Sequence, residues 1–307
     1  MSHAACRLRA AAALLLVAAP FALAQTVRAA GALDRIREAA RLRVGYRVDA
    51  RPFSYKTGES DIAGYSIELC RKVADDMKTE LGLSSLSVDW VPLGLDQRFS
   101  ALQQGRVDML CGADTVTLER RAEVSFSIPI FPGGVGALIR ADAAPRLRDV
   151  LAGRGQPFRP TWRAAATQLL QSRAFSVVSG TTADEWLAAR FTDLHISADV
   201  RRVASYDVGV RAVVDRTSDA LFGERAILLA AARHSGSGRD VVLVDRLFSH
   251  EPLAFALPRG DENLRLVVDR SLSRLYRSGA IGDIYAHAFG EPDEQTLTFF
   301  RWNALPD

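Results

Sequence analysis

Short apolar segments alternate with segments of helical periodicity along most of this 307-residue chain, and this alternation constrains its fold more than any other feature. Residues 42–46 form an apolar run, and residues 65–81 follow with apolar side chains at helical spacing. The pattern continues with an apolar run at 87–91, a helical segment at 97–104 and another apolar run at 107–111. Helices packed on a parallel sheet, with right-handed crossovers, produce this alternation. The sequence therefore predicts an α/β fold.

A cluster of prolines and glycines at residues 129–134 interrupts this pattern. Another apolar run covers residues 135–139, and a similar alternation starts again at 175–178. We therefore expect a second α/β lobe to begin here. Residues 146–173 are rich in Arg, Pro and Gly and contain one predicted helix, at 162–171. We interpret this segment as an insertion on the surface of the second lobe.

The first residues have the pattern of a secretory signal peptide. Two arginines, Arg7 and Arg9, precede an apolar run, and small residues stand before Gln25. The apolar run is shorter than the roughly 18 to 20 residues that a membrane span needs, which favours a cleaved signal over a membrane anchor. We expect residues 1–24 to be removed on export, with cleavage between Ala24 and Gln25.

Composition and charge narrow the range of partners. The chain is 48% hydrophobic and 24% charged, which is typical of globular domains. Loss of residues 1–24 lowers the formal net charge from +3 by two, to +1, and the remaining arginines are mixed with acidic residues. We therefore expect no binding to nucleic acid or to an anionic membrane surface.

Two cysteines, Cys70 and Cys111, remain in the mature chain. An oxidising compartment would let them form a disulfide if their backbones approach closely enough. The alternative is a buried free thiol, because Cys70 lies on a helix face that is predicted to belong to the core.

The segment 111–120 follows a predicted strand and opens a predicted helix. Its small and hydroxyl residues would place backbone N–H groups and hydroxyls at the carboxyl end of the strand, as an anion site requires. Arg120 lies one turn into the helix, where its guanidinium group can bind a carboxylate through two charge-assisted hydrogen bonds. The alternative for this segment alone is a helix N-cap at Thr117 with a solvated Arg120.

A second segment of this kind, residues 179–185, also joins a strand to a helix. Gly180 would let the backbone approach a ligand closely, and Thr182 with Glu185 forms a capping-box pattern. Two such turns, one in each predicted lobe, could face each other across a cleft and bind one carboxylate between them. A capping role alone is the alternative for Thr182.

Seven short segments, in order along nearly all of the mature chain, resemble the type II periplasmic amino-acid-binding proteins of ABC transporters (solute-binding family 3). Among these proteins, the likeness is strongest to the glutamate/aspartate-binding branch. The segments are specific as a set rather than singly. They are Leu42–Arg47, Arg51–Tyr55, Gly64–Ser66, Asp96–Arg98, Cys111–Gly112, Leu118–Arg120 and Ser179–Thr182.

The resemblance implies a two-lobed α/β fold with two mixed, mainly parallel sheets, flanking helices and two crossover strands. Residues 34–131 and 250–307 would form the first lobe, and residues 132–249 the second. The implied function is that of a monomeric periplasmic protein, not an enzyme, without cofactor or metal. It would close its lobes on an amino acid and deliver that ligand to the membrane permease of an ABC importer.

The resemblance also implies a set of ligand-binding residues. The helix arginine that binds the ligand's α-carboxylate in that family matches Arg120, and its supporting hydroxyls match Thr115, Thr181 and Thr182. The family's aspartate that receives the α-amino group matches Glu224.

The acidic branch adds arginines for the side-chain carboxylate, and its pattern matches Arg47 and Arg98. Two guanidinium groups fixed in a cleft are costly without an anion, which favours glutamate or aspartate as the ligand. The alternative is that each forms a surface or lobe-bridging salt bridge. Besides Glu224, which replaces an aspartate, three positions depart from the pattern: Ala113 replaces a serine, Val208 replaces a histidine, and Asp114, where a small hydroxyl residue is common, could repel an acidic ligand.

Two other function classes stay open. A periplasmic dehydratase of the same fold would use a cleft carboxylate, such as Glu224 or Asp114, as general acid or base. The same module also forms ligand-binding parts of membrane receptors, so the loaded protein could act on a receptor. The histidines are far apart, without metal-ligand spacing, and residues 133–136 lack the dinucleotide-binding glycine spacing and are interpreted as a hinge.

Overall fold

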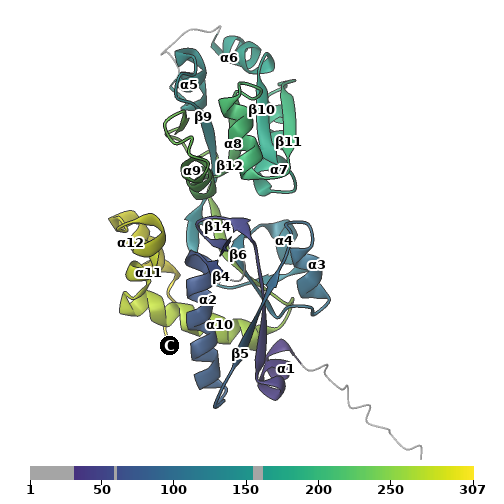
Figure 1. The fold of residues 1–307 in the computed structure, drawn as a ribbon, viewed down its shortest axis with the longest axis vertical. Coiled ribbons are helices and arrows are strands. Elements are labelled where there is room, and N and C mark those ends of the chain that lie inside the picture. Colours follow the sequence, from purple (N-terminus) through teal and green to yellow (C-terminus); the bar gives the residue numbers. More distant parts are fainter. Residues whose placement is uncertain (1–30, 59–60, 155–161) are drawn as a thin grey trace, which may run out of the picture. The chain divides into compact units, whose positions relative to one another are not determined.

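The computed structural model describes residues 31–58, 61–154 and 162–307 (Figure 1). The predicted signal segment 1–24, with its cleavage site between Ala24 and Gln25, lies outside these residues. Within the described part of the chain, no helix is long and apolar enough to cross a membrane.

The first sheet has the strand order β5-β1-β6-β14-β7, and β8 also pairs with β14. The strands that the alternation predicts, β5, β1 and β6, are parallel to one another. Strand β14, which comes from a distant part of the sequence, is antiparallel to β6, β7 and β8. The bounds are β1 Arg41–Tyr46, β5 Ser87–Pro92, β6 Met109–Thr115, β7 Ser125–Phe126, β8 Phe131–Gly133 and β14 Glu251–Leu257.

Amphipathic helices cover this sheet. The side chains of Cys70, Val73 and Met77 on helix α2 are buried in the core. Helix α2 packs against α10, and the two helices lie side by side in Figure 1. Its observed start agrees with the helical periodicity, and its end differs by one residue. The helices are α1 Ala32–Ala39, α2 Tyr65–Glu80, α3 Arg98–Gln103, α4 Leu118–Glu123, α10 Glu262–Ser278, α11 Ile281–Phe289 and α12 Glu294–Asn303.

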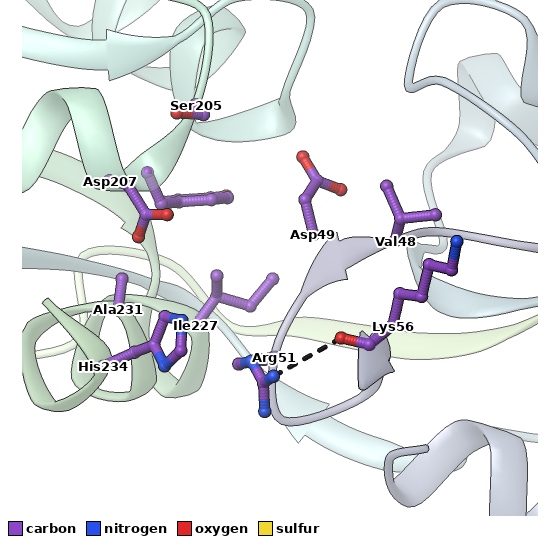
Figure 2. Close-up of a pocket in the computed structure, with 10 residues that line it drawn as sticks. Val48, Asp49, Arg51, Lys56, Ser205, Asp207, Ile227, Ala231 and His234 are labelled. Carbon is purple, nitrogen blue, oxygen red and sulfur yellow. Dashed lines mark hydrogen bonds between the residues drawn. The ribbon is translucent and has the colours of Figure 1, made fainter. Parts of the chain in front are cut away.

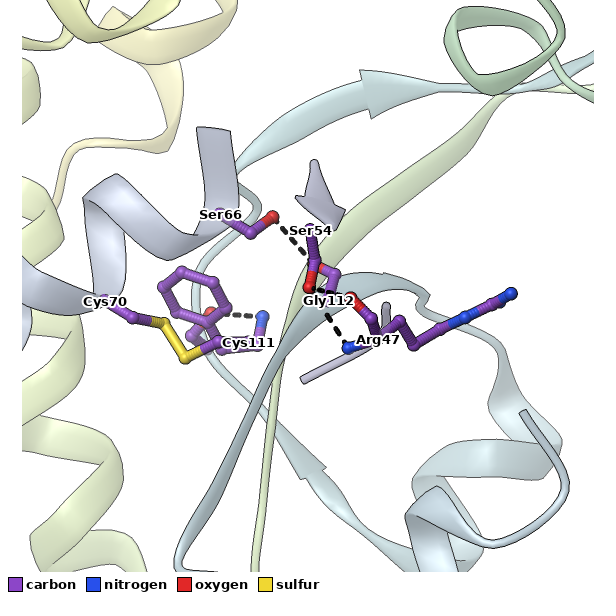
Figure 3. Close-up of a disulfide and its surroundings, with 8 residues drawn as sticks. Arg47, Ser54, Ser66, Cys70, Cys111 and Gly112 are labelled. Carbon is purple, nitrogen blue, oxygen red and sulfur yellow. Dashed lines mark hydrogen bonds between the residues drawn. A yellow bond between two sulfur atoms is a disulfide. The ribbon is translucent and has the colours of Figure 1, made fainter. Parts of the chain in front are cut away.

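The disulfide between Cys70 and Cys111 joins α2 to β6, with the two Cα atoms 6.3 Å apart (Figure 3). The bond decides between the two alternatives that the sequence left open. It spans 41 residues of sequence, and a closed loop of this size typically stabilises a fold by about 2 to 4 kcal/mol. The disulfide therefore ties helix α2 to β6, the strand that ends with Asp114 and Thr115.

A small antiparallel sheet follows β1 and was not predicted from the sequence. Its strands are β2 Asp49–Ala50, β3 Ser54–Thr57 and β4 Asp61–Ala63. Each is too short to show a period of two, which explains why the apolar pattern gave no signal.

The second sheet has the order β11-β10-β12-β9-β13. Strand β10 is parallel to β11 and β12, whereas β9 is antiparallel to β12 and β13. Its helices include α6, at the bounds that the sequence predicts, and α5, which the sequence analysis missed in the same insertion. The bounds are β9 Val135–Arg140, β10 Ala174–Val178, β11 Asp199–Val203, β12 Ala220–Glu224, β13 Val241–Leu243, α5 Pro145–Leu151, α6 Trp162–Gln171, α7 Thr182–Asp193, α8 Tyr206–Val214 and α9 Arg225–His234.

The chain crosses between the two sheets at Gly134 and again before β14. Here Gly133 pairs with Glu251, and a Cβ atom on Gly134 would lie 2.2 Å from the carbonyl oxygen of Ser249. The two crossover segments therefore approach too closely for any residue but glycine at 134. The predicted α/β fold class, with mixed sheets and crossover strands, is confirmed. The lobe boundaries 34–131, 132–249 and 250–307 stay a prediction.

Candidate functional site

Arg47 follows the end of β1, where a serine anchors its backbone. The Ser54 hydroxyl donates to the Arg47 carbonyl (2.7 Å) and accepts from the Arg47 N–H (3.1 Å), as Figure 3 shows. The Arg47 side chain extends away from the disulfide, and its Nη2 atom lies 2.7 Å from Asp49 Oδ1. The Asp49 side chain is 44% exposed, so solvent weakens this ion pair.

Strand β6 carries the first predicted turn. It extends to Thr115, so the expected strand end at Cys111 was wrong, and residues 111–115 belong to the strand itself. The Ser66 hydroxyl of α2 donates to the Gly112 carbonyl (2.8 Å), which adds a second tie beside the disulfide. The strand therefore presents Asp114 and Thr115 from a fixed backbone.

Arg98 is buried and paired within the protein. Its Nε atom donates to Asp114 Oδ1 at 2.7 Å, and its Nη1 atom donates to the Leu95 carbonyl. Both side chains of the pair are less than a tenth exposed. The guanidinium carbon also lies 4.1 Å from the centre of the Phe99 ring. The charge of Arg98 is therefore already matched by Asp114.

Arg120 has a different environment. Thr117 caps α4 by accepting from the Arg120 N–H at 3.1 Å, as the alternative interpretation of this segment predicts. The same interpretation expected a solvated Arg120, but the side chain of Arg120 is half-buried. Its Nη1 atom donates to the Thr115 carbonyl at 3.2 Å. Among the described residues, no carboxylate forms an ion pair with it.

Burial lowers the pKa of the Arg120 guanidinium, and the positive charge of Arg98 lowers it further. The negative charges of Asp114, Glu185 and Glu251 act in the opposite direction. An incoming carboxylate would relieve both of the unfavourable effects, because it would pair with the cation and oppose the charge of Arg98.

The second turn is capped by a different threonine from the one the sequence predicts. Thr181, not Thr182, is the N-cap of α7 and accepts from the Asp184 N–H at 3.3 Å. The Thr181 hydroxyl also donates to the Val178 carbonyl at 2.8 Å, so its proton is used within the second lobe. Gly180 has φ +72°, a left-handed conformation that starts this turn. The Thr182 hydroxyl is therefore not needed to cap α7 and can bind residues outside this turn.

Thr182 contacts residues of the first sheet. Its Oγ1 atom lies 3.4 Å from Thr115 Oγ1 and donates to Glu251 Oε2 at 2.6 Å. The Ser249 hydroxyl donates to the other oxygen of Glu251 at 2.6 Å. Sequence reasoning missed Glu251, since a single glutamate at the start of a strand gives no local signal.

Glu224 lies at the end of β12 and caps α9 by accepting from the Ile227 N–H at 2.9 Å. Its Oε1 atom is buried and has no hydrogen-bond partner in the described structure. Burial raises the pKa of Glu224 to about 7, the nearby backbone N–H groups of Ile227, Ala226 and Gly134 lower it, and the charge of Glu251 raises it. Glu224 therefore changes charge near neutral pH and has one oxygen open to a donor.

Two cavities lie near these residues. Figure 2 shows a pocket of about 180 Å³, bordered by Arg51 of the β2–β3 segment and by Asp207 and His234 of α8 and α9. No predicted ligand-binding residue lines it. A cavity of about 10 Å³, roughly the space that one water needs, is bordered by Arg47, Arg98 and other residues of the first lobe. The Arg98–Asp114 pair fills the space beside it.

The structure thus brings most of the predicted residues together from both lobes. Thr115 and Thr182 meet, Arg120 hydrogen-bonds to the Thr115 backbone, and Arg47 borders the same small cavity as Arg98. Within the described ranges, no group of three or more His, Cys, Asp or Glu side chains could hold a metal ion.

The sequence of this chain matches one family model over residues 42–291, the bacterial extracellular solute-binding proteins, family 3. The chain belongs to this family.

Curated relatives of this family member bind amino acids. It is 27% identical over 263 residues to the L-glutamate/L-aspartate-binding protein of Pseudomonas aeruginosa, which covers 85% of this chain and 81% of the relative. It is 24% identical to the glutamate/aspartate import solute-binding protein of Escherichia coli, with 87% and 83% covered. A shorter match, 31% identical over 102 residues, links it to the cyclohexadienyl dehydratase of P. aeruginosa and covers 33% of this chain and 35% of that enzyme.

Solved structures share the fold. An ancestral amino acid-binding protein, described as a precursor of cyclohexadienyl dehydratase, superposes with a TM-score of 0.68 at 26% identity and covers 85% of this chain and 100% of that protein. A cysteine-binding protein from Campylobacter jejuni gives a TM-score of 0.67 at 20% identity, with 86% and 96% covered. The fold and the membership of solute-binding protein family 3 are therefore established.

Proposed function

We propose that this protein holds one L-amino acid between its two lobes and presents it to the membrane permease of an ABC importer. The observation that carries the proposal is the half-buried guanidinium group of Arg120, which lacks a carboxylate partner in the described structure and lies beside Thr115. A ligand α-carboxylate supplies the missing anion. At the other end, the free oxygen of Glu224 accepts the α-ammonium group.

The proposed ligand is glutamate or aspartate, with Arg47 and Arg98 as partners of the side-chain carboxylate. Two features support this choice: both arginines border one small cavity, and the two relatives described above bind glutamate and aspartate. Arg98 is already hydrogen-bonded to the Asp114 carboxylate, so a ligand carboxylate must displace Asp114 or share the guanidinium group with it. The affinity for an acidic ligand therefore depends on how readily Asp114 gives way.

Ligand binding would close the lobes about the crossover segments near Gly134. A ligand that contacts residues of both lobes binds the closed form more tightly and so shifts the population toward that form, which the permease then recognises. The protein would act as a monomer in the periplasm after removal of residues 1–24. Thr181 would contribute through its backbone rather than its hydroxyl, whose proton is bound to the Val178 carbonyl.

Calorimetric titration of refolded, ligand-free mature protein against the twenty common amino acids tests this function. We expect one-to-one binding, tightest for glutamate or aspartate, with no product formed. Tight binding of a neutral or basic amino acid would retain the transport function and overturn the acidic ligand. Absence of binding to any amino acid would contradict the function as a whole.

A dehydratase is the second candidate, and the raised pKa of Glu224, about 7, favours it. A buried carboxyl group that holds its proton near neutral pH can protonate a leaving hydroxyl group. Water then departs, and a neighbouring C–H or C–carboxylate bond breaks, with loss of H+ or CO2, to supply the electron pair of the new double bond. The partial match to a cyclohexadienyl dehydratase points to prephenate-like acids as substrates. Incubation with prephenate, followed by chromatography, tests this candidate: product formed by the wild type and lost in Glu224→Gln would support it.

A further inference from the structure

The carboxylate of Glu251 joins the crossover to the second turn. One oxygen accepts from Thr182 and the other from Ser249, both at 2.6 Å. The Ser249 hydroxyl oxygen in turn accepts from the Val135 N–H at 3.1 Å, on the neighbouring crossover segment. Ser249 therefore links Glu251 to both crossover segments, and the carboxylate in this fixed position accepts from Thr182.

The direction of the hydrogen bond decides what else Thr182 can bind. A threonine hydroxyl has one proton and two acceptor lone pairs. The proton of Thr182 is donated to Glu251, since an ionised carboxylate can only accept. Thr182 then offers acceptors to a ligand, and a ligand carboxylate, which needs donors, gains nothing from it. An ammonium group, with three donors and no acceptor, is its complement.

The surrounding charges favour the same ligand group. The negative charge of Glu251 raises the pKa of Glu224 and also opposes the lowering of the Arg120 pKa, so Glu251 lies within electrostatic range of each of these two groups. Glu251 accepts from the Thr182 hydroxyl and lies within electrostatic range of Glu224, whereas the guanidinium group of Arg120 donates to the Thr115 carbonyl. An amino acid matches this separation of charge when its carboxylate faces Arg120 and its ammonium group faces the two glutamates.

We propose that Glu251 is a specificity-determining residue: it holds Thr182 as a hydrogen-bond acceptor and, with Glu224, forms the subsite for the ligand's ammonium group. This inference rests on the proposed amino-acid-binding function. It differs from the role that the family resemblance implies for Thr182, which is to support the α-carboxylate. Acids that lack an ammonium group would meet two carboxylates here and be excluded.

The substitution Glu251→Gln tests this role, since glutamine keeps the shape and loses the charge. The twenty amino acids are titrated into the wild type, and the tightest ligand is then titrated into the variant. We expect the variant to bind that ligand roughly 10- to 100-fold more weakly, as for loss of a hydrogen bond to a charged group. If Thr182 instead served the ligand carboxylate, the neutral amide oxygen of Glu251→Gln would compete more weakly for the Thr182 proton, and the ligand would bind more tightly. Unchanged or tighter binding would therefore overturn the inference.

Two further measurements separate this role from others. Glu291→Gln removes the same charge from an exposed position and should leave the affinity unchanged. A purely structural role in the crossover would act independently of Thr182. The losses from Glu251→Gln and Thr182→Val would then multiply in the double variant, whereas the proposed role predicts a double variant no weaker than the weaker single one. Failure of the wild type to bind any amino acid would refute the proposed function. A wild type that binds an amino acid, with a Glu251→Gln variant that binds it equally well, would refute only the role of Glu251.

Discussion

Arg98 and Arg120 lie against the same aromatic ring, yet only one of them has a carboxylate partner within the protein. Their guanidinium carbons are 4.1 and 5.6 Å from the centre of the Phe99 ring. Arg98 is buried against Asp114, whereas Arg120 hydrogen-bonds only to a backbone carbonyl and lacks an ion pair in the described structure.

The difference shows which cation is prepared for a ligand. Removing one partner from a buried ion pair is costly, so the Arg98–Asp114 pair resists an incoming anion. Arg120 bears its cost of burial without compensation until an anion arrives, which makes ligand binding the event that satisfies it. The proposed function accordingly assigns the α-carboxylate, which all amino acids share, to Arg120, and the recognition of the side chain to Arg98.

The largest effect is expected for Arg120→Ala. Loss of the unpaired cation should weaken binding of glutamate by about 2 to 5 kcal/mol, or roughly 30- to 5,000-fold. Arg120→Lys should restore little, because an ammonium group cannot form the two parallel hydrogen bonds. Calorimetry measures both, and Arg121→Ala, one residue along on the exposed side of α4, is the matched control. Equal affinities in Arg120→Ala and wild type would remove the distinction between the two arginines.

The second prediction makes Arg98 resemble Arg120. Asp114→Asn should destabilise the ligand-free protein by about 3 kcal/mol, since it leaves a buried cation unpaired. It should also tighten glutamate binding, because the ligand's side chain no longer competes with Asp114, and should leave glutamine binding almost unchanged. Thermal melting with and without each amino acid measures both effects. A variant that gains equally for both ligands would show that Arg98 does not contact the side chain.

The third prediction tests the opposite end of the ligand through pH. Because Glu224 has a pKa of about 7, it is mostly ionised at pH 8 and mostly protonated at pH 6. Affinity for an ammonium-bearing ligand should fall roughly tenfold over this interval, and Glu224→Gln should flatten the dependence. Binding near pH 7 should also release a proton, which calorimetry in buffers of different ionisation enthalpy detects. A profile that stays flat from pH 6 to 8 would count against Glu224 as the ammonium partner.

The same group affects stability with a definite sign. The folded protein keeps the Glu224 proton up to about pH 7, whereas the unfolded chain loses it near its ordinary value of 4.5. The folded state therefore binds more protons between these values, and stability without ligand falls as pH rises through this window. Denaturant unfolding at pH 5 and pH 8, with Glu224→Gln as the control, measures this contribution.

The sequence predicted what depends on local order. The bounds of α6, those of β10 to within one residue and the position of α2 followed from the local pattern. Arg120 was proposed from a short segment and Glu224 from the family resemblance, and their roles stay predictions. The sequence did not reveal contacts between distant residues. Arg98 and Asp114 are 16 residues apart, and Thr182 of α7 and Glu251 of β14 are 69 residues apart, so only the fold brings each pair together. The change of cap from Thr182 to Thr181 has another cause: adjacent threonines are equivalent by composition, and the backbone of the turn selects one of them.

The smallest effect is expected for Arg47, which sharpens the comparison by adding a third cation. Its side chain is 11% exposed, but its partner Asp49 is 44% exposed, so solvent weakens the pair and a ligand carboxylate can replace Asp49 without leaving Arg47 unpaired. Arg47→Ala should therefore lower glutamate affinity only a few-fold and leave glutamine affinity unchanged, as calorimetry with the two ligands would show. A loss as large as that of Arg120→Ala would mean that Arg47 binds the ligand in the desolvated closed form. The exposure of Asp49 in the ligand-free protein would then not indicate how strongly Arg47 binds the ligand.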